Sequence, residues 1–173
     1  AIVWVHGGSF AFGSKTSPEI VEEATTFARK GFVNVSINYR LSPDGCTMVT
    51  VECLPAVVDA KHDAQAAVRF VRAHADAYAV DENRIAIAGT SAGAITALNV
   101  GYGPEDVGNS GNPGFASTVR ASVSLSGAKI LTTPNPGEAS ALLFHGTDDP
   151  LVPYQWALDT VAAKVKEAGE AAA

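Results

Sequence analysis

One serine stands in a setting that could make it a nucleophile. Ser91 lies in the pentapeptide Gly89–Gly93, between an apolar run that ends at Ala88 and a stretch of small residues compatible with a helix. This order of strand, G-x-S-x-G and helix is typical of a nucleophile elbow, a turn so tight that the hydroxyl projects clear of the sheet. Side chains at Gly89 and Gly93 would collide with neighbouring backbone. The pattern predicts nucleophilic chemistry at Ser91, and the alternative is an ordinary serine in a turn of small residues.

A glycine-containing loop could stabilise the negative charge that such an attack creates. The segment His6–Phe10 follows the apolar run 1–5, and its two glycines allow backbone N–H groups to face a ligand. A serine nucleophile needs hydrogen-bond donors for the developing oxyanion. We expect these donors to be the backbone N–H groups of Gly8, Ser9 and Ala92.

A third loop, residues 145–153, could supply the carboxylate that orients a catalytic base. It follows the apolar run 139–144 and contains Asp148 and Asp149. Ligands of an open parallel sheet bind outside the carboxyl ends of the strands. Because all three loops follow predicted strands, we expect them to converge at one edge of the sheet.

Predicted strands alternate with predicted helices along the chain. The strands are 1–5, 32–38, 84–88, 119–125 and 139–144, and the helices are 18–30, 56–78, the segment from Ser91 to about Gly101, and a closing helix. Residues 102–118 contain four glycines and two prolines and are expected to form a long loop. The alternation predicts the α/β class with a doubly wound, mostly parallel sheet.

Helical spacing also predicts which side chains are buried. In 56–78 the expected buried stripe comprises Ala64, Val68, Val71, Ala75 and Tyr78, and the residues expected in solvent are Lys61, Arg69 and Arg72. In the closing helix the expected apolar face comprises Tyr154, Leu158, Val161 and Val165.

Composition limits the classes of protein to which the chain can belong. The 173 residues are 47% hydrophobic and 17% charged, as expected of one globular domain with a core. The net charge of −6 argues against nucleic acid or an acidic membrane surface as a partner, because both attract clustered lysine and arginine. The sequence contains no run of eighteen apolar residues, so no membrane-spanning helix is predicted.

Four motifs in a fixed order resemble a known superfamily. The order HGGSF, NYRLSP, GTSAG and HGTDDPLVP is similar to that of the α/β-hydrolases, and more narrowly to esterases with an HGGG-type oxyanion loop, related to carboxylesterases and acetyl- or feruloyl-esterase-like proteins. The likeness covers essentially the whole chain. It implies that residues 1–173 are a single partial α/β-hydrolase domain without the first strands and the last strand of the fold.

The resemblance also implies site residues. In these esterases the motif HG-x-x-D-x-x-VP carries the catalytic acid on its aspartate, and the matching residue here is Asp149; Asp148 is interpreted as a solvated turn residue. The oxyanion loop reads HGGS instead of HGGG, a tolerable change because the donors are backbone groups.

The catalytic histidine is the main departure from the family pattern. The family order is serine, acid, histidine, and no histidine follows Asp149. His6 and His145 lie in motifs where the family uses them structurally, and His62 and His74 are interpreted as surface or packing residues of a helix. We therefore expect the histidine beyond Ala173 and expect the 173-residue piece itself to be nearly inactive, with apolar sheet edges exposed.

The two cysteines could form a small disulfide ring. Cys46 and Cys53 lie seven residues apart in one turn-rich connection. A disulfide favours a secreted or extracytoplasmic location; two separate buried thiols, compatible with a cytoplasmic location, are the alternative.

No metal or cofactor site is expected. Asp59, His62 and Asp63 share one helix face at a spacing that could hold a metal, but a second pair of ligands is lacking and a solvated face is the simpler interpretation. Neither a phosphate-binding loop nor a dinucleotide fingerprint is present.

Together these features predict a serine hydrolase that cleaves small-molecule or carbohydrate-linked carboxylic esters through an acyl-enzyme. The short connection 129–138 leaves no room for an inserted cap, which favours an open site lined by residues 102–118 and short acyl groups on larger alcohols. A peptidase or amidase on the same fold, and a non-catalytic binding protein of this fold, are the alternatives.

Overall fold

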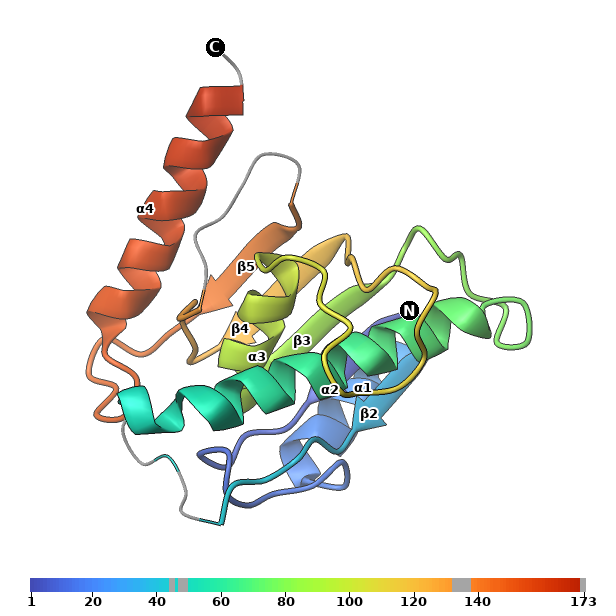
Figure 1. Cartoon of the computed structure of the whole chain (residues 1–173), viewed down its shortest axis with the longest axis horizontal. Coiled ribbons are helices and arrows are strands. Elements are labelled where there is room, and N and C mark those ends of the chain that lie inside the picture. The colour runs from blue at the N-terminus through green and yellow to red at the C-terminus, as the bar shows by residue number, and fades with distance from the viewer. Residues whose placement is uncertain (44–45, 47–49, 132–137, 172–173) are drawn as a thin grey trace.

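The computed structural model describes residues 1–43, 46, 50–131 and 138–171 (Figure 1). Its five strands form one sheet in which every neighbouring pair is parallel. In the order in which they lie side by side, they are β2 (Asn34–Ile37), β1 (Ile2–Val5), β3 (Ala86–Thr90), β4 (Ala121–Leu125) and β5 (Ser140–Phe144). The predicted doubly wound parallel sheet is confirmed, with boundaries that differ from the predicted ones by at most two residues.

The strand order reverses its direction between β1 and β3. From β1 the chain adds β2 on one side, then crosses to the other side of β1 and continues outward through β3, β4 and β5. Such a reversal leaves a crevice at the carboxyl ends of the two central strands, where ligands bind in folds of this class. The loops that follow β1 and β3 are the two that contain Gly8 and Ser91.

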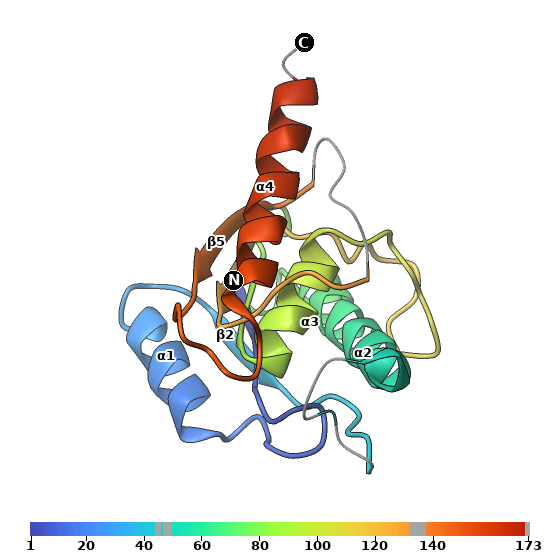
Figure 2. The ribbon, with the colours of Figure 1, turned by 90° about the vertical axis from the view of Figure 1, so that its left-hand side faces the viewer.

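The helices cover the two faces of the sheet unequally. Helix α1 (Pro18–Ala28) lies on one face, whereas α2 (Leu54–Ala73), preceded by the short turn η1 (Val51–Cys53), and α3 (Ala92–Gly101) lie on the other (Figure 2). The last helix, α4 (Tyr154–Ala171), extends away from the sheet beside β5 (Figure 1). In the part of the chain that the structure describes, no helix is long and apolar enough to cross a membrane.

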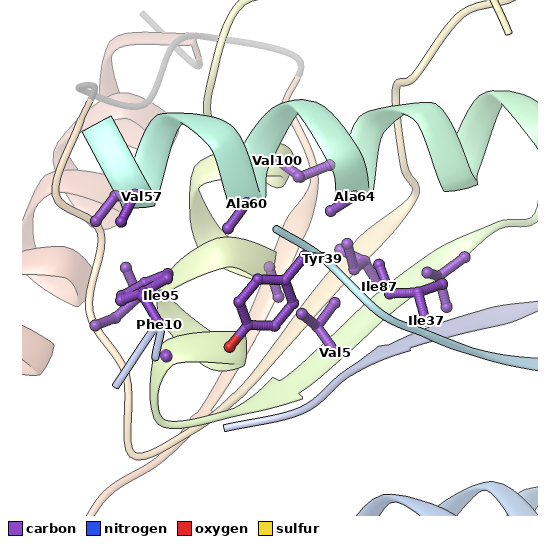
Figure 3. Packing of buried hydrophobic residues seen from close by; sticks show 14 of the residues in the cluster. Val5, Phe10, Ile37, Tyr39, Val57, Ala60, Ala64, Ile87, Ile95 and Val100 are labelled. Atoms are coloured by element: carbon purple, nitrogen blue, oxygen red, sulfur yellow. The ribbon is translucent and has the colours of Figure 1, made fainter. Parts of the chain in front are cut away.

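The main core lies between the sheet and the α2–α3 pair. Strand residues such as Val5 and Ile87 meet small helix residues such as Ala60 and Ala64 there (Figure 3). A smaller cluster around Trp4 and Ile20 holds α1 on the opposite face. The alanine stripe of α2 allows the helix to lie close to the strands, which fixes the frame that carries the loops.

Most of the buried stripe predicted for α2 is confirmed. Ala64, Val68 and Val71 are fully buried, and Ala75 is buried just past the helix end. The helix stops at Ala73, however, and the side chain of Tyr78 is 45% exposed. Placing Tyr78 on the buried stripe was wrong because the periodic pattern continues into a non-helical turn.

The prediction that Lys61 and Arg69 face solvent is also wrong. Arg69 is fully buried, and its guanidinium donates hydrogen bonds to the backbone carbonyls of Asp106, Val107 and Gly111. Lys61 is 5% exposed and donates to the carbonyl of Pro104. The irregular segment 102–118 therefore lies over α2 and shields these two side chains from solvent. Arg72 is partly buried and donates to the Ala116 and Thr118 carbonyls.

Apart from the half-buried Tyr154, the predicted apolar face of the closing helix is exposed in this chain. Leu158, Val161 and Val165 are 41%, 44% and 67% exposed, whereas the buried positions of α4 include Ala157 and Thr160. The reason is local: the Lys129 backbone N–H donates to the Thr160 hydroxyl, so the start of the β4–β5 connection packs on that side.

One face of the edge strand β5 is open as well. Leu142 and Phe144 are 52% and 56% exposed, and the strand register places them on the same face of the sheet as Trp4 and α1. This agrees with the expected apolar sheet edge. The predicted absence of a cap concerns residues 129–138, of which 132–137 lie outside the described residues.

Candidate active site

Ser91 sits at a strained turn between β3 and α3. Its backbone has φ 53° and ψ −117°, an unfavourable combination for a residue with a side chain. Two hydrogen bonds hold the turn: the Ser91 N–H donates to the Leu125 carbonyl of β4 at 2.8 Å, and the Ile95 N–H donates to the Ser91 carbonyl at 2.9 Å. The side chain makes no capping hydrogen bond to the helix. The hydroxyl is therefore not committed to holding the turn together.

The glycines on either side of the serine are required by close packing. A Cβ atom at Gly93 would lie 2.0 Å from the Val5 carbonyl oxygen, and one at Gly89 would lie 2.4 Å from the Gly93 backbone. Both distances are far below van der Waals contact. The elbow is pressed against the end of β1, which brings Ser91 to the loop that follows that strand.

The loop after β1 passes directly beside the elbow. A Cβ atom at Gly7 would lie 3.0 Å from the Thr90 carbonyl oxygen and 3.3 Å from the Ser91 Cβ. Gly8, Ser9 and Phe10 then have consecutive positive φ angles of 115°, 50° and 56°. This run reverses the loop sharply, and the Gly8 carbonyl accepts hydrogen bonds from the Ala11 and Phe12 N–H groups.

The three expected oxyanion donors have no acceptor within the described residues. None of the hydrogen bonds among those residues uses the backbone N–H of Gly8, Ser9 or Ala92. The Ala92 N–H belongs to the first turn of α3, where helical geometry provides no intrahelical acceptor and the helix dipole favours negative charge. These groups are free to bind an anionic oxygen.

Asp149 is held by the loop after β5. Its Oδ1 accepts hydrogen bonds from the Leu151 and Val152 N–H groups at 2.9 and 3.0 Å, and its Oδ2 lies 3.5 Å from His145 Nε2. Partial burial alone raises the pKa of this carboxyl, but the backbone hydrogen bonds, the nearby His145 and a hydrogen bond from Ser126 outweigh it and lower the pKa below the usual 3.8. Asp149 is a fixed carboxylate.

One small pocket joins these loops. Its walls are residues that follow β1, β2, β3 and β5, namely Ser9, Phe10, Cys46, Ser91, Ala92, Ile95, Leu151 and Val152. The structure thus brings Ser9, Ser91 and Ala92 together, and the two residues whose N–H groups fix Asp149 complete the wall. Gly8 and Asp149 do not line the pocket, and Asp148 is exposed.

None of the four histidines lines this pocket. His6 is buried, stacks on Tyr39 with ring centroids 4.4 Å apart, and contacts the Gly7 carbonyl through Nδ1. His145 Nε2 lies 2.8 Å from the Val152 carbonyl. Both histidines therefore support their loops, in keeping with the structural role expected of them.

The two remaining histidines belong to α2 and its C-terminal end. His62 Nε2 lies 2.9 Å from Asp106 Oδ2, in the irregular segment that covers the helix. His74 Nδ1 lies 2.8 Å from the Phe70 carbonyl. The interpretation of both as surface or packing residues agrees with these contacts, and no catalytic base is assigned within the chain.

The possible disulfide between Cys46 and Cys53 is present in the structure. Both residues are buried, at 6% and 5% exposure, within the main core. Cys46 reaches the pocket beside Ser91. The sequence analysis did not connect the cysteines with the site.

The acidic face of α2 serves an ion pair. Arg40, which follows β2, contacts Asp59 and Asp63, both at 2.9 Å. Three hydrogen bonds, from the Arg40 backbone, the Arg40 guanidinium and Ser110, help to lower the pKa of Asp63 despite its burial. Among the described residues, no group of three or more His, Cys, Asp or Glu side chains could hold a metal ion.

Several pocket residues were missed at the sequence level. Ile95 stands one helical turn after Ser91, and Val152 stands three residues after Asp149, so helical periodicity and the motif spacing could have indicated both. Phe10 carries no such signal, because it depends on the unusual backbone of the loop after β1.

Comparison with known proteins supports the resemblance to esterases of the α/β-hydrolase superfamily. The profile of the BD-FAE family matches residues 1–128. Phenmedipham hydrolase of Pseudarthrobacter oxydans is 36% identical over 99 residues, which cover 55% of this chain and 18% of that protein. Carboxylesterase NlhH of Mycobacterium tuberculosis is 33% identical over 107 residues, which cover 62% of this chain and 30% of that protein. The matched segments therefore span less than a third of these relatives.

Solved structures show the same fold over a larger share of the chain. The esterase Est2 of Thermogutta terrifontis, solved with propionate bound, superposes with a TM-score of 0.81 at 24% sequence identity. The match covers 96% of this chain and 68% of the esterase. Fold, motif order and family profile agree: the chain belongs to the BD-FAE family of esterase-like α/β-hydrolases and contains part of that fold.

Proposed function

We propose that the protein is a serine hydrolase that cleaves carboxylic esters through an acyl-enzyme, and that residues 1–173 are part of one such domain. The observation that carries the proposal is the shared pocket of Ser9, Ser91 and Ala92 at the reversal of the strand order. A nucleophile and hydrogen-bond donors for an oxyanion are the two groups that acyl transfer needs side by side. The carboxylesterase among the relatives is consistent with this reaction.

In the proposed reaction, the Ser91 hydroxyl attacks the ester carbonyl carbon. The carbonyl oxygen becomes an oxyanion that accepts hydrogen bonds from the backbone N–H groups of Ala92, Ser9 and Gly8. Loss of one such donor costs about 3 kcal/mol in the activation barrier. Collapse of the intermediate expels the alcohol, and water then releases the acid from Ser91.

A histidine must accept the Ser91 proton, and we place it outside residues 1–173. None of the four histidines in the chain lines the pocket, and the matched esterase is about half as long again as the part that this chain covers. Asp149 orients this histidine and remains ionised at neutral pH, consistent with the lowered pKa of its carboxyl.

We propose short acyl groups as the preferred acids. The pocket beside Ser91 has a volume of about 20 Å³, little more than the roughly 10–15 Å³ that one water molecule needs. Est2, the matched esterase, has been solved with propionate and with butyrate bound. A methyl or ethyl group fits this space, whereas a long lipid chain does not.

The alcohol part of the ester would then lie outside the pocket, on an apolar rim. Phe12, Leu41 and Leu151 are 63%, 41% and 54% exposed, and each belongs to a loop that follows a strand at the carboxyl edge of the sheet. Burying such side chains against a ligand is favourable, at about 25 cal/mol per Å². Larger apolar or carbohydrate-linked alcohols are the proposed leaving groups.

The buried disulfide supports a location outside the cytoplasm, in an oxidising compartment. Detection of the mature protein in the culture medium or the cell envelope of its source would test this. Recovery of the protein in the cytoplasm with free thiols would overturn it.

The reaction is tested on the whole protein with p-nitrophenyl acetate and p-nitrophenyl palmitate. We expect acetate to be hydrolysed with the higher kcat/KM, and a fluorophosphonate probe to label Ser91. Ser91→Ala should abolish both signals, whereas Ser140→Ala, an exposed serine of β5, should retain them. A preference for palmitate would refute the short-acyl proposal, and turnover that survives Ser91→Ala would refute the assignment of the nucleophile.

A further inference from the structure

Tyr39 contacts the oxyanion loop from a distant part of the chain. It follows β2, 33 residues after His6, yet its hydroxyl donates a buried hydrogen bond to the His6 carbonyl at 3.1 Å. Its ring also stacks on the His6 imidazole at an interplanar angle of 18°. The motif NYRLSP includes Tyr39, but neither that motif nor the family comparison gives this side chain a role.

The same ring reaches the other end of the loop. The ring centroids of Tyr39 and Phe10 lie 6.1 Å apart, with the rings edge to face at 63°. Figure 3 shows the Tyr39 hydroxyl directed away from α2. Gly8 and Ser9, whose backbone N–H groups are proposed oxyanion donors, lie in the sequence between the two residues that Tyr39 contacts. One buried side chain therefore holds the loop on both sides of these donors.

The direction of each donor is fixed by the carbonyl of its own peptide group. A trans peptide is planar, so its N–H points opposite to its C=O. The Ser9 N–H shares a peptide with the Gly8 carbonyl, which accepts hydrogen bonds from two N–H groups of the turn that follows. The Gly8 N–H shares a peptide with the Gly7 carbonyl, which accepts a hydrogen bond from His6 Nδ1 at 2.7 Å. The turn therefore orients the Ser9 N–H, whereas the His6 imidazole orients the Gly8 N–H.

Tyr39 in turn fixes the His6 imidazole. The stacked ring covers one face of the imidazole, and the hydroxyl holds the backbone carbonyl of the same residue. Burial raises the pKa of the Tyr39 hydroxyl above its usual 10, so the hydroxyl stays protonated and keeps donating well above neutral pH. A Cβ atom at Gly13 would lie 2.6 Å from both His6 Nδ1 and the Gly7 oxygen. The returning loop thus leaves no room for this contact to shift toward it.

We propose that Tyr39 is a positioning residue that sets the direction of the Gly8 N–H through the His6 imidazole. Tyr39 does not line the pocket, so it acts through the loop and not on the substrate. The use of the Gly8 N–H as an oxyanion donor rests on the proposed function, whereas its orientation rests on the contacts of His6. Loss of the Tyr39 hydroxyl frees the His6 carbonyl, and loss of the whole ring frees the imidazole as well.

Ester turnover by the whole protein tests the catalytic consequence. Complete loss of one oxyanion donor lowers kcat about a hundredfold or more. We expect Tyr39→Leu to approach that loss, and Tyr39→Phe, which keeps the stacked ring, to lower kcat about tenfold. KM should change less than about twofold, because oxyanion donors act on the transition state more than on the bound ester. p-Nitrophenyl acetate and butyrate should show the same losses, because both present the same carbonyl oxygen.

Tyr78→Phe is the matched control for loss of a tyrosine hydroxyl. Tyr78 is 45% exposed and lies beyond the end of α2, away from the loop, so this variant should keep the wild-type kcat. Labelling with a fluorophosphonate, run to completion, counts the active molecules, so kcat is given per active site. Circular dichroism checks that each variant is folded, and Tyr39→Phe carries the test where Tyr39→Leu does not fold.

The direction of the Gly8 N–H is measured separately, without turnover. Residual dipolar couplings report the orientation of each N–H bond in the whole protein labelled with ¹⁵N-glycine and ¹⁵N-serine. We expect the Gly8 coupling to change in both Tyr39 variants and to stay at the wild-type value in Tyr78→Phe. The Ser9 coupling should change less than that of Gly8, because the turn fixes the Ser9 N–H.

A Gly8 coupling that stays at its wild-type value in the folded Tyr39 variants would overturn the proposal, as would an active enzyme whose kcat they leave unchanged. A raised KM or a changed butyrate-to-acetate ratio at constant kcat also contradicts it, since Tyr39 would then act on the pocket wall through Phe10. A changed Gly8 coupling with a lowered kcat supports it. A changed coupling in a protein whose wild type hydrolyses no ester supports the positioning of Gly8 and refutes only the proposed function.

Discussion

Replacing Gly93 with alanine should disrupt the elbow more than any other single methyl group added to its glycines. The new Cβ would lie 2.0 Å from the Val5 carbonyl oxygen and 2.6 Å from both the Val5 carbonyl carbon and the His6 oxygen. Ordinary contacts of a Cβ atom lie at 3.4–4 Å, so α3 and the end of β1 must separate by more than 1 Å. All three contacted atoms are backbone atoms, and Val5 and His6 are buried.

Overpacking a core by one methyl group costs about 1–3 kcal/mol and sometimes more. Here side-chain rotation cannot relieve the overlap, so we expect Gly93→Ala to lower the free energy of unfolding by about 3 kcal/mol or more. Urea unfolding followed by circular dichroism measures the change. Gly111→Ala is the matched control, since a Cβ there meets nothing within 4 Å, and it should change the free energy by less than about 0.5 kcal/mol. A Gly93→Ala protein within 1 kcal/mol of the wild type would refute the reasoning.

Three further predictions concern strain, a buried cation and a titrating carboxyl. Because the backbone of residue 91 is unfavourable for any side chain, Ser91→Gly should be more stable than Ser91→Ala by about 1 kcal/mol in thermal unfolding; equal stability would contradict the strain. Arg69→Met leaves buried carbonyls unpaired and should cost about 2–4 kcal/mol in urea unfolding, whereas Arg29→Met, on the exposed end of α1, should cost almost nothing. The lowered pKa of Asp149 stabilises the fold fully above the unfolded value of about 3.9, and this contribution is lost as the pH falls through the lower folded pKa. Asp149→Asn should therefore be less stable than wild type at pH 7, with a difference that shrinks below pH 4; a pH-independent difference would refute the assignment.

The strands and the elbow could be predicted because their signals are local. An apolar run followed by Gly89–Gly93 specifies a buried strand and a tight turn without reference to the rest of the chain. The buried state of Arg69 could not be predicted in this way. Its acceptors lie 37 to 42 residues later, in a segment with no regular structure, and periodicity describes which residues share a helix face but not what covers that face.

The closing helix is a second case in which residue spacing predicts a shared face but not whether that face is buried. Leu158, Val161 and Val165 do share a face of α4, as their spacing predicts, yet that face is exposed in this chain. The pattern identifies an apolar surface, and burial depends on which other segment contacts it. In this chain the start of the β4–β5 connection contacts Thr160 instead of these three residues.

The same difference between local signals and contacts of distant segments applies to the pocket beside Ser91. Ser9, Ser91 and Ala92 could be placed together from motifs alone, because each motif follows a strand and parallel strands end at one edge. Cys46 could not, since its segment carries neither a periodic pattern nor a catalytic motif. A disulfide joins it to Cys53, the residue before α2. Motifs therefore predict which groups of this site meet, whereas the other residues that line the pocket depend on contacts between segments that no motif describes.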